Sequence, residues 1–69
     1  MEMTNVDSSN VAAIGFDESS QTLQVEFKNG TAYQYFDVPE AIYDGLLSAA
    51  SVGQYLHQHV KGIYRYSRV

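Results

Sequence analysis

The stretch KNGTAYQYF, Lys28–Phe36, contains the turn that decides how the first half of the chain folds. The Asn and Gly at its second and third positions both tolerate the positive φ that tight hairpin turns require. On the N-terminal side, TLQVEF (Thr22–Phe27) alternates apolar and polar residues, which is the period of a strand with one wet and one dry face. We therefore predict that Thr22–Phe27 and Thr31–Phe36 pair as an antiparallel hairpin.

The length of the hairpin loop decides whether the two tyrosines of the return strand face the core. If the loop is the Asn-Gly pair alone, both rings lie opposite polar residues of the preceding strand. If it is Lys28–Gly30, with the glycine left-handed in a bulge, Tyr33 lies opposite Val25 and Tyr35 opposite Leu23. We favour this second register, because each buried apolar side chain contributes roughly 1.5 to 3 kcal/mol. It makes the tyrosines core-edge residues whose hydroxyls reach water or a partner.

Outward from the hairpin, further segments have the patterns of regular elements. VAAIGF (Val11–Phe16) is typical of a strand, and Pro39 suits the first turn of a helix. A second helix is expected to start at a capping box, Ser51–Gln54, and to end at a left-handed Gly62. Ile63–Tyr66 then forms either a last short strand or an ordered tail.

The order of these elements predicts an α+β fold. A small antiparallel sheet of three strands, or four if the last segment is a strand, is followed by two helices packed on one face of the sheet. The chain has 69 residues, which is room for one small domain. We expect residues 1–10 to be a flexible N-terminal segment and residues 11–69 to be that single domain.

Composition narrows the classes of protein to consider. The chain has no cysteine, so packing alone must stabilise its small core. No apolar run approaches the roughly 20 residues that span a bilayer, and the start MEMTNVDSSN lacks the layout of a signal peptide. These features predict a cytoplasmic protein with no membrane partner.

Charge is distributed unevenly along the chain. The net charge is -4, which taken whole argues against a nucleic-acid partner, because phosphate binding depends mainly on Lys and Arg. All eight acids, however, lie in the first 44 residues, together with a single cation, Lys28. The last 25 residues carry three cations and no acid, so a basic tail follows an acidic body.

The sequence gives little support to catalysis or metal binding. Asp17-Glu18 lie in a turn and Asp37 and Glu40 at a helix start, with no base nearby in sequence, and no phosphate-cradling motif is present. His57 and His59 are two apart, which on a helix places them on different faces, so they cannot chelate one metal together. We expect no enzyme activity, no metal and no cofactor.

The C-terminal tail HQHVKGIYRYSRV interleaves cations with tyrosines. Cations that follow phosphates and rings that stack on bases are what proteins use to bind single-stranded nucleic acid. The alternative is that the tyrosines pack on the sheet while the cations are solvated or pair with the acidic body. The candidate RNA- or partner-binding residues are Lys61, Tyr64, Arg65, Tyr66 and Arg68, with Tyr33 and Tyr35 contributing if they are exposed.

The chain also resembles the KTSC domain, a small module named after the C-terminus of certain lysyl-tRNA synthetases and found as a stand-alone bacterial protein too. The resemblance rests on Ser8-Ser9, F-x-N-G over Phe27–Gly30, Tyr33-x-Tyr35, Val38-Pro39, Tyr43, Ala50-Ser51 with Gly53, Tyr55-Leu56, Val60-Lys61 and Tyr64-x-Tyr66. It implies a module of uncertain function for which the synthetase context suggests RNA.

Together these observations predict a small non-catalytic binding module that contacts RNA or tRNA through its basic aromatic C-terminal segment. The alternative is a protein-protein interaction or self-associating domain, present as a monomer or weak homodimer, because a small sheet leaves an unpaired edge and the body and tail carry opposite charges.

Overall fold

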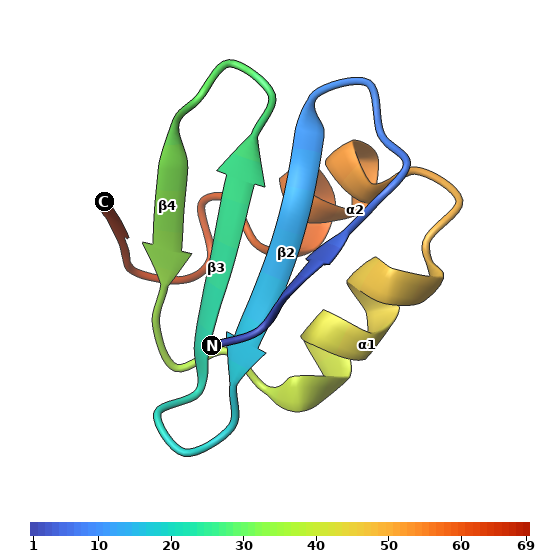
Figure 1. Cartoon of the computed structure of the whole chain (residues 1–69). Coiled ribbons are helices and arrows are strands. Elements are labelled where there is room, and N and C mark those ends of the chain that lie inside the picture. The colour runs from blue at the N-terminus through green and yellow to red at the C-terminus, as the bar shows by residue number, and fades with distance from the viewer.

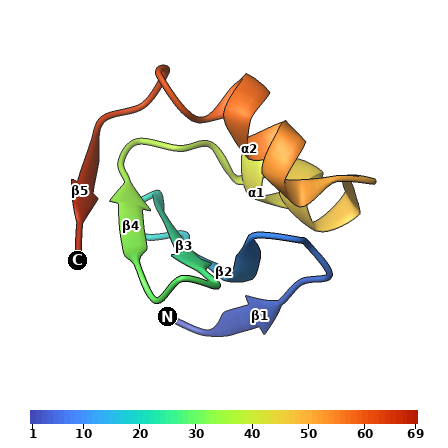
Figure 2. The same ribbon diagram turned by 90° about the horizontal axis from the view of Figure 1, so that it is seen from above.

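Two helices lie on one face of an antiparallel sheet in a computed structural model that describes residues 1–69 (Figures 1 and 2). The five strands are neighbours in chain order, so every connection joins adjacent strands. The strands are β1 (Met3–Asn5), β2 (Val11–Asp17), β3 (Thr22–Phe27), β4 (Ala32–Tyr35) and β5 (Tyr66–Arg68), and the helices are α1 (Glu40–Ser48) and α2 (Val52–His59). The expected α+β class is confirmed.

The β3–β4 hairpin has the three-residue loop and therefore the apolar register. Val25 is paired with Tyr33 and Leu23 with Tyr35. The amide of Phe27 donates to the carbonyl of the residue after the loop, Thr31, at 2.8 Å, and Gly30 has φ +90°. The left-handed conformation of Gly30 thus places both tyrosines on the face of the sheet that packs against the core. Tyr35 is only 4% exposed there, and Tyr33 is half-buried.

The sheet has five strands, so the prediction of three or four was too low. The first additional strand, β1, lies within residues 1–10, the segment expected to be flexible, and pairs with β2 through Met3 and Gly15. A Cβ at Gly15 would lie 2.7 Å from the carbonyl oxygen of Glu2 and 2.5 Å from the sulfur of Met3. The N-terminal segment can lie against β2 only because residue 15 is a glycine.

The second additional strand, β5, begins where the candidate fourth strand was expected to end. Ile63–Tyr66 forms a turn and the approach to the sheet, and the pairing with β4 runs from Tyr66, opposite Tyr35, to Arg68, opposite Tyr33. The strand is short and all three of its residues are exposed. The chain therefore returns from the helices to close the sheet on the β4 side.

The helices begin and end close to where the sequence indicates. The hydroxyl of Ser51 accepts a hydrogen bond from the amide of Gln54 at 3.3 Å, which is the predicted N-cap of α2. The helix itself ends at His59, three residues before the left-handed Gly62, which has φ +80°. Neither helix has the length and apolar composition needed to cross a membrane.

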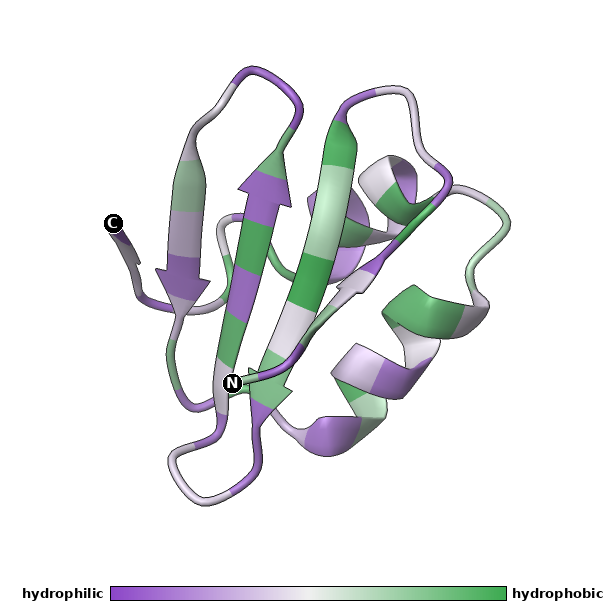
Figure 3. Ribbon diagram, viewed as in Figure 1, coloured by the Kyte–Doolittle hydropathy of each residue, from purple (hydrophilic) through white to green (hydrophobic).

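The core lies between the sheet and the helices, and the alternating apolar positions of β3 can be followed in Figure 3. It is formed by Val11, Ile14, Leu23, Val25, Tyr35, Val38, Leu46, Val52, Leu56 and Val60. Because Val60 is fully buried, it fixes the C-terminal end of α2 against the sheet. The turn that follows, with Lys61 and Gly62, is thereby held beside β4.

Candidate functional site

Two adjoining hollows lie where the hairpin loop, the residues before β2 and the turn after α2 come together. They share Tyr33 and Lys61, and we call them together the groove. The polar half, of about 460 Å³, is lined by Ser9, Asn10, Phe27, Lys28, Asn29, Thr31, Tyr33 and Lys61. The ring half, of about 390 Å³, is lined by Tyr33, Tyr35, Lys61, Gly62 and Tyr66.

Backbone hydrogen bonds hold the polar half together. The amide of Lys28 donates to the carbonyl of Asn10 at 2.9 Å, which ties the hairpin loop to the segment before β2. In that segment the hydroxyl of Ser8 accepts from the amides of Asn10 and Val11, at 3.4 and 3.3 Å. These two loops are therefore ordered before any ligand arrives.

Two side-chain amides of the polar half present their NH₂ donors to a ligand. The side-chain oxygen of Asn29 accepts from both the amide and the hydroxyl of Thr31, at 3.1 and 2.7 Å. The side-chain oxygen of Asn10 accepts from the hydroxyl of Ser8 at 3.3 Å. The NH₂ groups of Asn10 and Asn29 form no hydrogen bond within the chain, so both remain available as donors.

Lys28 and Lys61 give the groove its charge. The ammonium of Lys61 lies 5.4 Å from the centroid of the Phe27 ring, at a distance typical of a cation–π contact. Both lysines are exposed, and no carboxylate lines either half of the groove. In a chain with twice as many acids as cations, this local excess of positive charge favours an anionic ligand.

The ring half contains a cluster of aromatic side chains. Tyr33 lies edge-on to Phe27 on one side and to Tyr66 on the other, with centroid distances of 5.9 and 5.8 Å. Tyr66 also lies 5.9 Å from Tyr35. Tyr66 is 64% exposed, so its neighbours hold the ring in place while most of its surface faces solvent.

Burial changes the acidity of the innermost ring of this cluster. It raises the pKa of the Tyr35 hydroxyl above its ordinary value of 10.0, and the nearby Tyr33 and Tyr66 raise it further. The physical cause is that a phenolate loses hydration in this setting and would be repelled by neighbouring phenolates. The Tyr35 hydroxyl is therefore a neutral group at physiological pH.

The structure separates two of the predicted tail cations from the groove. Arg65 forms an ion pair with Asp37 at 3.1 Å and lies 5.6 Å from the ring of Phe36, at the opposite end of β4 from the hairpin loop. Arg68 is exposed on β5, opposite Tyr33 in register, and does not line the groove. Tyr64 is half-buried and packs against the core.

The predicted site residues thus divide into two groups. Lys61, Tyr66, Tyr33 and Tyr35 meet in the groove, whereas the other three tail residues do not. The sequence interpretation missed Lys28, together with Ser9, Asn10, Phe27, Asn29, Thr31 and Gly62. The sequence did contain a signal for these residues. The motifs Ser8-Ser9, F-x-N-G and Val60-Lys61, on which the family resemblance rests, lie far apart in sequence, and each contributes residues to the groove.

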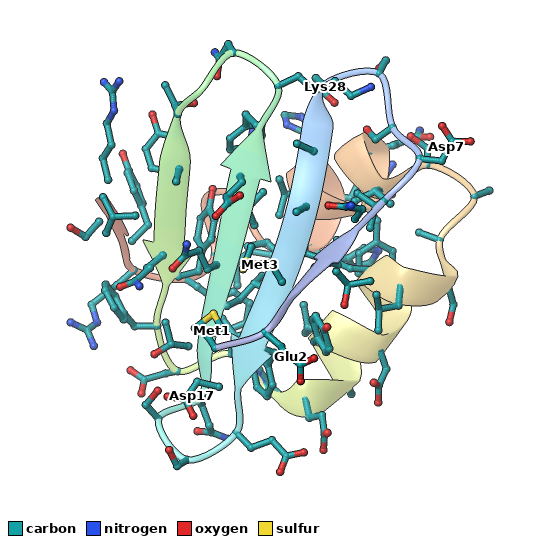
Figure 4. The ribbon with its side chains drawn as sticks, in the orientation of Figure 1. Met1, Glu2, Met3, Asp7, Asp17 and Lys28 are labelled. Atoms are coloured by element: carbon teal, nitrogen blue, oxygen red, sulfur yellow. The ribbon has the colours of Figure 1, made fainter.

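Asp17, Glu18 and Glu40 lie close together at the other end of the sheet. Figure 4 shows Lys28 at the hairpin end and Asp17 at the opposite end, in the turn between β2 and β3. Hydrogen bonds from Ser19 and Ser20 lower the pKa of Asp17. Beside this turn, the hydrogen bond and the charge of Glu18 raise the pKa of Glu40 at the start of α1. The molecule therefore has a basic groove and a distant acidic end.

Comparison with family models gives one match that covers most of the chain. The model described as the KTSC domain matches residues 7–66. The crystal structure of a KTSC domain protein from Yersinia pestis superposes with a TM-score of 0.93 at 30% sequence identity, covering 99% of this chain and 96% of that one. Similarity at this level extends over the whole fold, including the segments that form the groove.

Relatives of two kinds are similar in sequence. Lysine–tRNA ligase from Nostoc sp. is 37% identical over 59 residues, which is 86% of this chain but 10% of that protein. A protein from Tsukamurella paurometabola is 38% identical over 63 residues, and an uncharacterized protein from Stutzerimonas stutzeri is 37% identical over 70 residues. The matches cover 94% and 99% of these two proteins. The chain thus spans about a tenth of the ligase and nearly all of the small relatives.

Proposed function

This chain belongs to the KTSC domain family, and we propose that it is a small non-catalytic module that binds single-stranded RNA in the groove. The observation that carries the proposal is the meeting of two lysines and an exposed, pre-positioned tyrosine in a groove without carboxylates. Lysines attract phosphates, and an exposed aromatic face stacks on an unpaired base.

The charge distribution supports single strands over duplexes as the partner. A duplex presents phosphates along a broad surface, and this chain carries a net charge of -4 with several acids at the end of the sheet opposite Lys28. A single strand can place one unstacked base and its phosphate in a local basic groove without approaching that acidic end. The proposed interface is therefore confined to the groove.

The relatives support RNA as the class of nucleic acid. Lysine–tRNA ligases from three organisms contain a region similar to this chain, and their name states that tRNA is their substrate. The region is only about a tenth of each ligase, so tRNA binding by this chain itself belongs to the proposal. A role on RNA also agrees with the cytoplasmic location expected from the sequence.

The test is a titration of fluorescently labelled single-stranded RNA, and of mixed tRNA, followed by anisotropy. We expect dissociation constants below about 100 μM in about 50 mM salt, the range of weak nucleic-acid binders, and weaker binding in about 200 mM salt. Lys61→Gln should weaken binding at least several-fold. The matched control is Arg65→Gln, which removes a tail cation outside the groove and should leave binding nearly unchanged.

Two results would contradict the proposal. One is the absence of salt-sensitive binding below about 100 μM for every RNA tested. The other is an equal loss of affinity in the Lys61 and Arg65 variants, which would indicate general attraction to the tail rather than binding in the groove.

A second candidate function, protein interaction or self-association, is favoured by the free edge of β5. All three residues of this edge strand are exposed, and the flanking Ile63 and Val69 are 61% and 62% exposed. Such an edge can pair with a strand of another chain. Sedimentation velocity at high protein concentration in low salt should then show a weak dimer, and a monomer under those conditions would count against self-association.

A further inference from the structure

We infer that the groove holds a single nucleotide, with its phosphate in the polar half and its base against Tyr66 in the ring half. The inference rests on the proposed RNA-binding function and gives that function a footprint and an orientation. Four features carry it: the donors of the polar half, the exposed ring, the position of Lys61 between them, and the acids elsewhere on the molecule.

The polar half has the chemistry of a phosphate site. Its charged side chains are the ammonium groups of Lys28 and Lys61, and its side-chain amides on Asn10 and Asn29 already use their oxygens within the chain. The two ammonium groups and the two free side-chain NH₂ groups are donors, which match the acceptor oxygens of a phosphate.

The ring half has the geometry of a stacking platform. Tyr66 is held by Tyr33, at an interplanar angle of 76°, and by Tyr35, at 43°, while 64% of its surface stays exposed. A ring that is already packed on its neighbours loses little conformational entropy when a base stacks on it. Stacking of this kind contributes about 1 to 3 kcal/mol per base.

Lys61 joins the two halves. It lines both hollows, and its ammonium lies 5.4 Å from the Phe27 ring centroid, beside the polar half. Its backbone is fixed by a hydrogen bond from its amide to the carbonyl of Leu56 at 2.9 Å. A base in the ring half and the phosphate of the same nucleotide in the polar half therefore share this lysine.

The surface that leads from the groove toward the acidic end adds little to the footprint. Arg65, the tail cation at the opposite end of β4 from the hairpin loop, pairs with Asp37. Beyond Arg65, an RNA strand that ran toward the β2–β3 turn and the start of α1 would meet the acids there. Nucleotides added in that direction would meet little attraction and some repulsion, so they add little affinity.

The first part of the test is a series of oligoadenylates, from the dinucleotide to about twelve nucleotides, titrated by anisotropy at two salt concentrations. We expect the affinity per binding position to change less than about threefold along the series. The logarithmic salt slope should be near -0.7, the value for about one neutralised phosphate on a single strand. Both numbers follow from a footprint of one nucleotide, whose single phosphate contacts both Lys28 and Lys61.

The second part separates the two halves by NMR, with adenosine, inorganic phosphate and adenosine monophosphate as probes of the intact chain. Phosphate should shift the amides of Lys28 and Asn29, adenosine those of Gly62 and Tyr66, and the monophosphate all four. Lys28→Gln should abolish the phosphate response alone and Tyr66→Ala the adenosine response alone. Ile63→Ala is the matched control, because Ile63 is as exposed as Tyr66 but lies outside the groove. Unchanged spectra elsewhere verify that each variant is folded.

The possible failures are distinguishable. If affinity per position rises about tenfold or more with length, the single-nucleotide footprint is wrong while RNA binding stands. If RNA binds but phosphate and adenosine shift the same amides, or none in the groove, the assignment of halves is wrong. If no oligonucleotide binds, the proposed function fails, and with it this inference.

Discussion

Tyr35 illustrates how one residue of a loop sets the environment of a side chain several positions away. Because the hairpin loop includes Lys28, Tyr35 lies opposite Leu23 and is buried. We predicted this register from the apolar pattern of β3. The same register brings Tyr33 beside Tyr66. The exposure of Tyr66 and the contact of Lys61 with Phe27 were not predictable, because they depend on where the chain returns after α2.

The raised pKa of Tyr35 predicts how stability changes in alkali. Because the folded state disfavours the phenolate, this group contributes stability that is fully present below pH 10.0 and is lost as pH rises through the folded pKa. Denaturant unfolding above pH 10 should therefore show a steeper loss of stability for the natural chain than for Tyr35→Phe. Equal slopes would contradict the burial of this hydroxyl.

At the scale of elements, local sequence patterns predicted the strands and helices that are stabilised by residues close in sequence. The β3–β4 hairpin, β2 and the two helices carry alternation, turn or cap residues, and each was predicted. β1 and β5 are three residues long, with no room for a periodic pattern, and both form by pairing with a strand that is already in place. Their positions depend on tertiary contacts such as the close approach of Glu2 to Gly15.

The cap of α2 gives a prediction about helix stability. Ser51→Ala removes the acceptor for the amide of Gln54 and should lower the free energy of unfolding by about 1 kcal/mol. Ser51→Asp should retain most of the stability, since Asp is an equally good cap. Chemical denaturation measures both variants, and an alanine variant as stable as the natural chain would show that this hydrogen bond contributes nothing.

The close approach at Gly15 gives a prediction about β1. Gly15→Ala places a methyl group against the carbonyl of Glu2 and the sulfur of Met3, and overlap of this kind costs about 1 to 3 kcal/mol. Hydrogen exchange of the β1 amides should become faster in the variant. A chain lacking the first five residues is the matched background, in which the same substitution should no longer be destabilising. A destabilisation of equal size there would contradict the role assigned to Gly15.

For the whole molecule, the groove is a property of the tertiary structure. It draws its lining from the residues before β2, the hairpin, β4, the turn after α2 and β5, so no single stretch of sequence contains it. Lys28 was the one cation of the acidic body, and the fold places it beside Lys61, away from the acidic turn (Figure 4). The proposed binding surface is therefore this groove rather than the basic tail that the sequence indicated.

The most direct test of this account is NMR mapping of a short single-stranded RNA on the chain. We predict that amide shifts concentrate at Lys28–Thr31, Gly62 and Tyr66, and that the amides of the β2–β3 turn and the start of α1 do not move. Shifts centred on Arg65 and Ile63, or no shifts at RNA concentrations up to about 1 mM, well above the range of weak nucleic-acid binding, would contradict the assignment of the groove as the binding site.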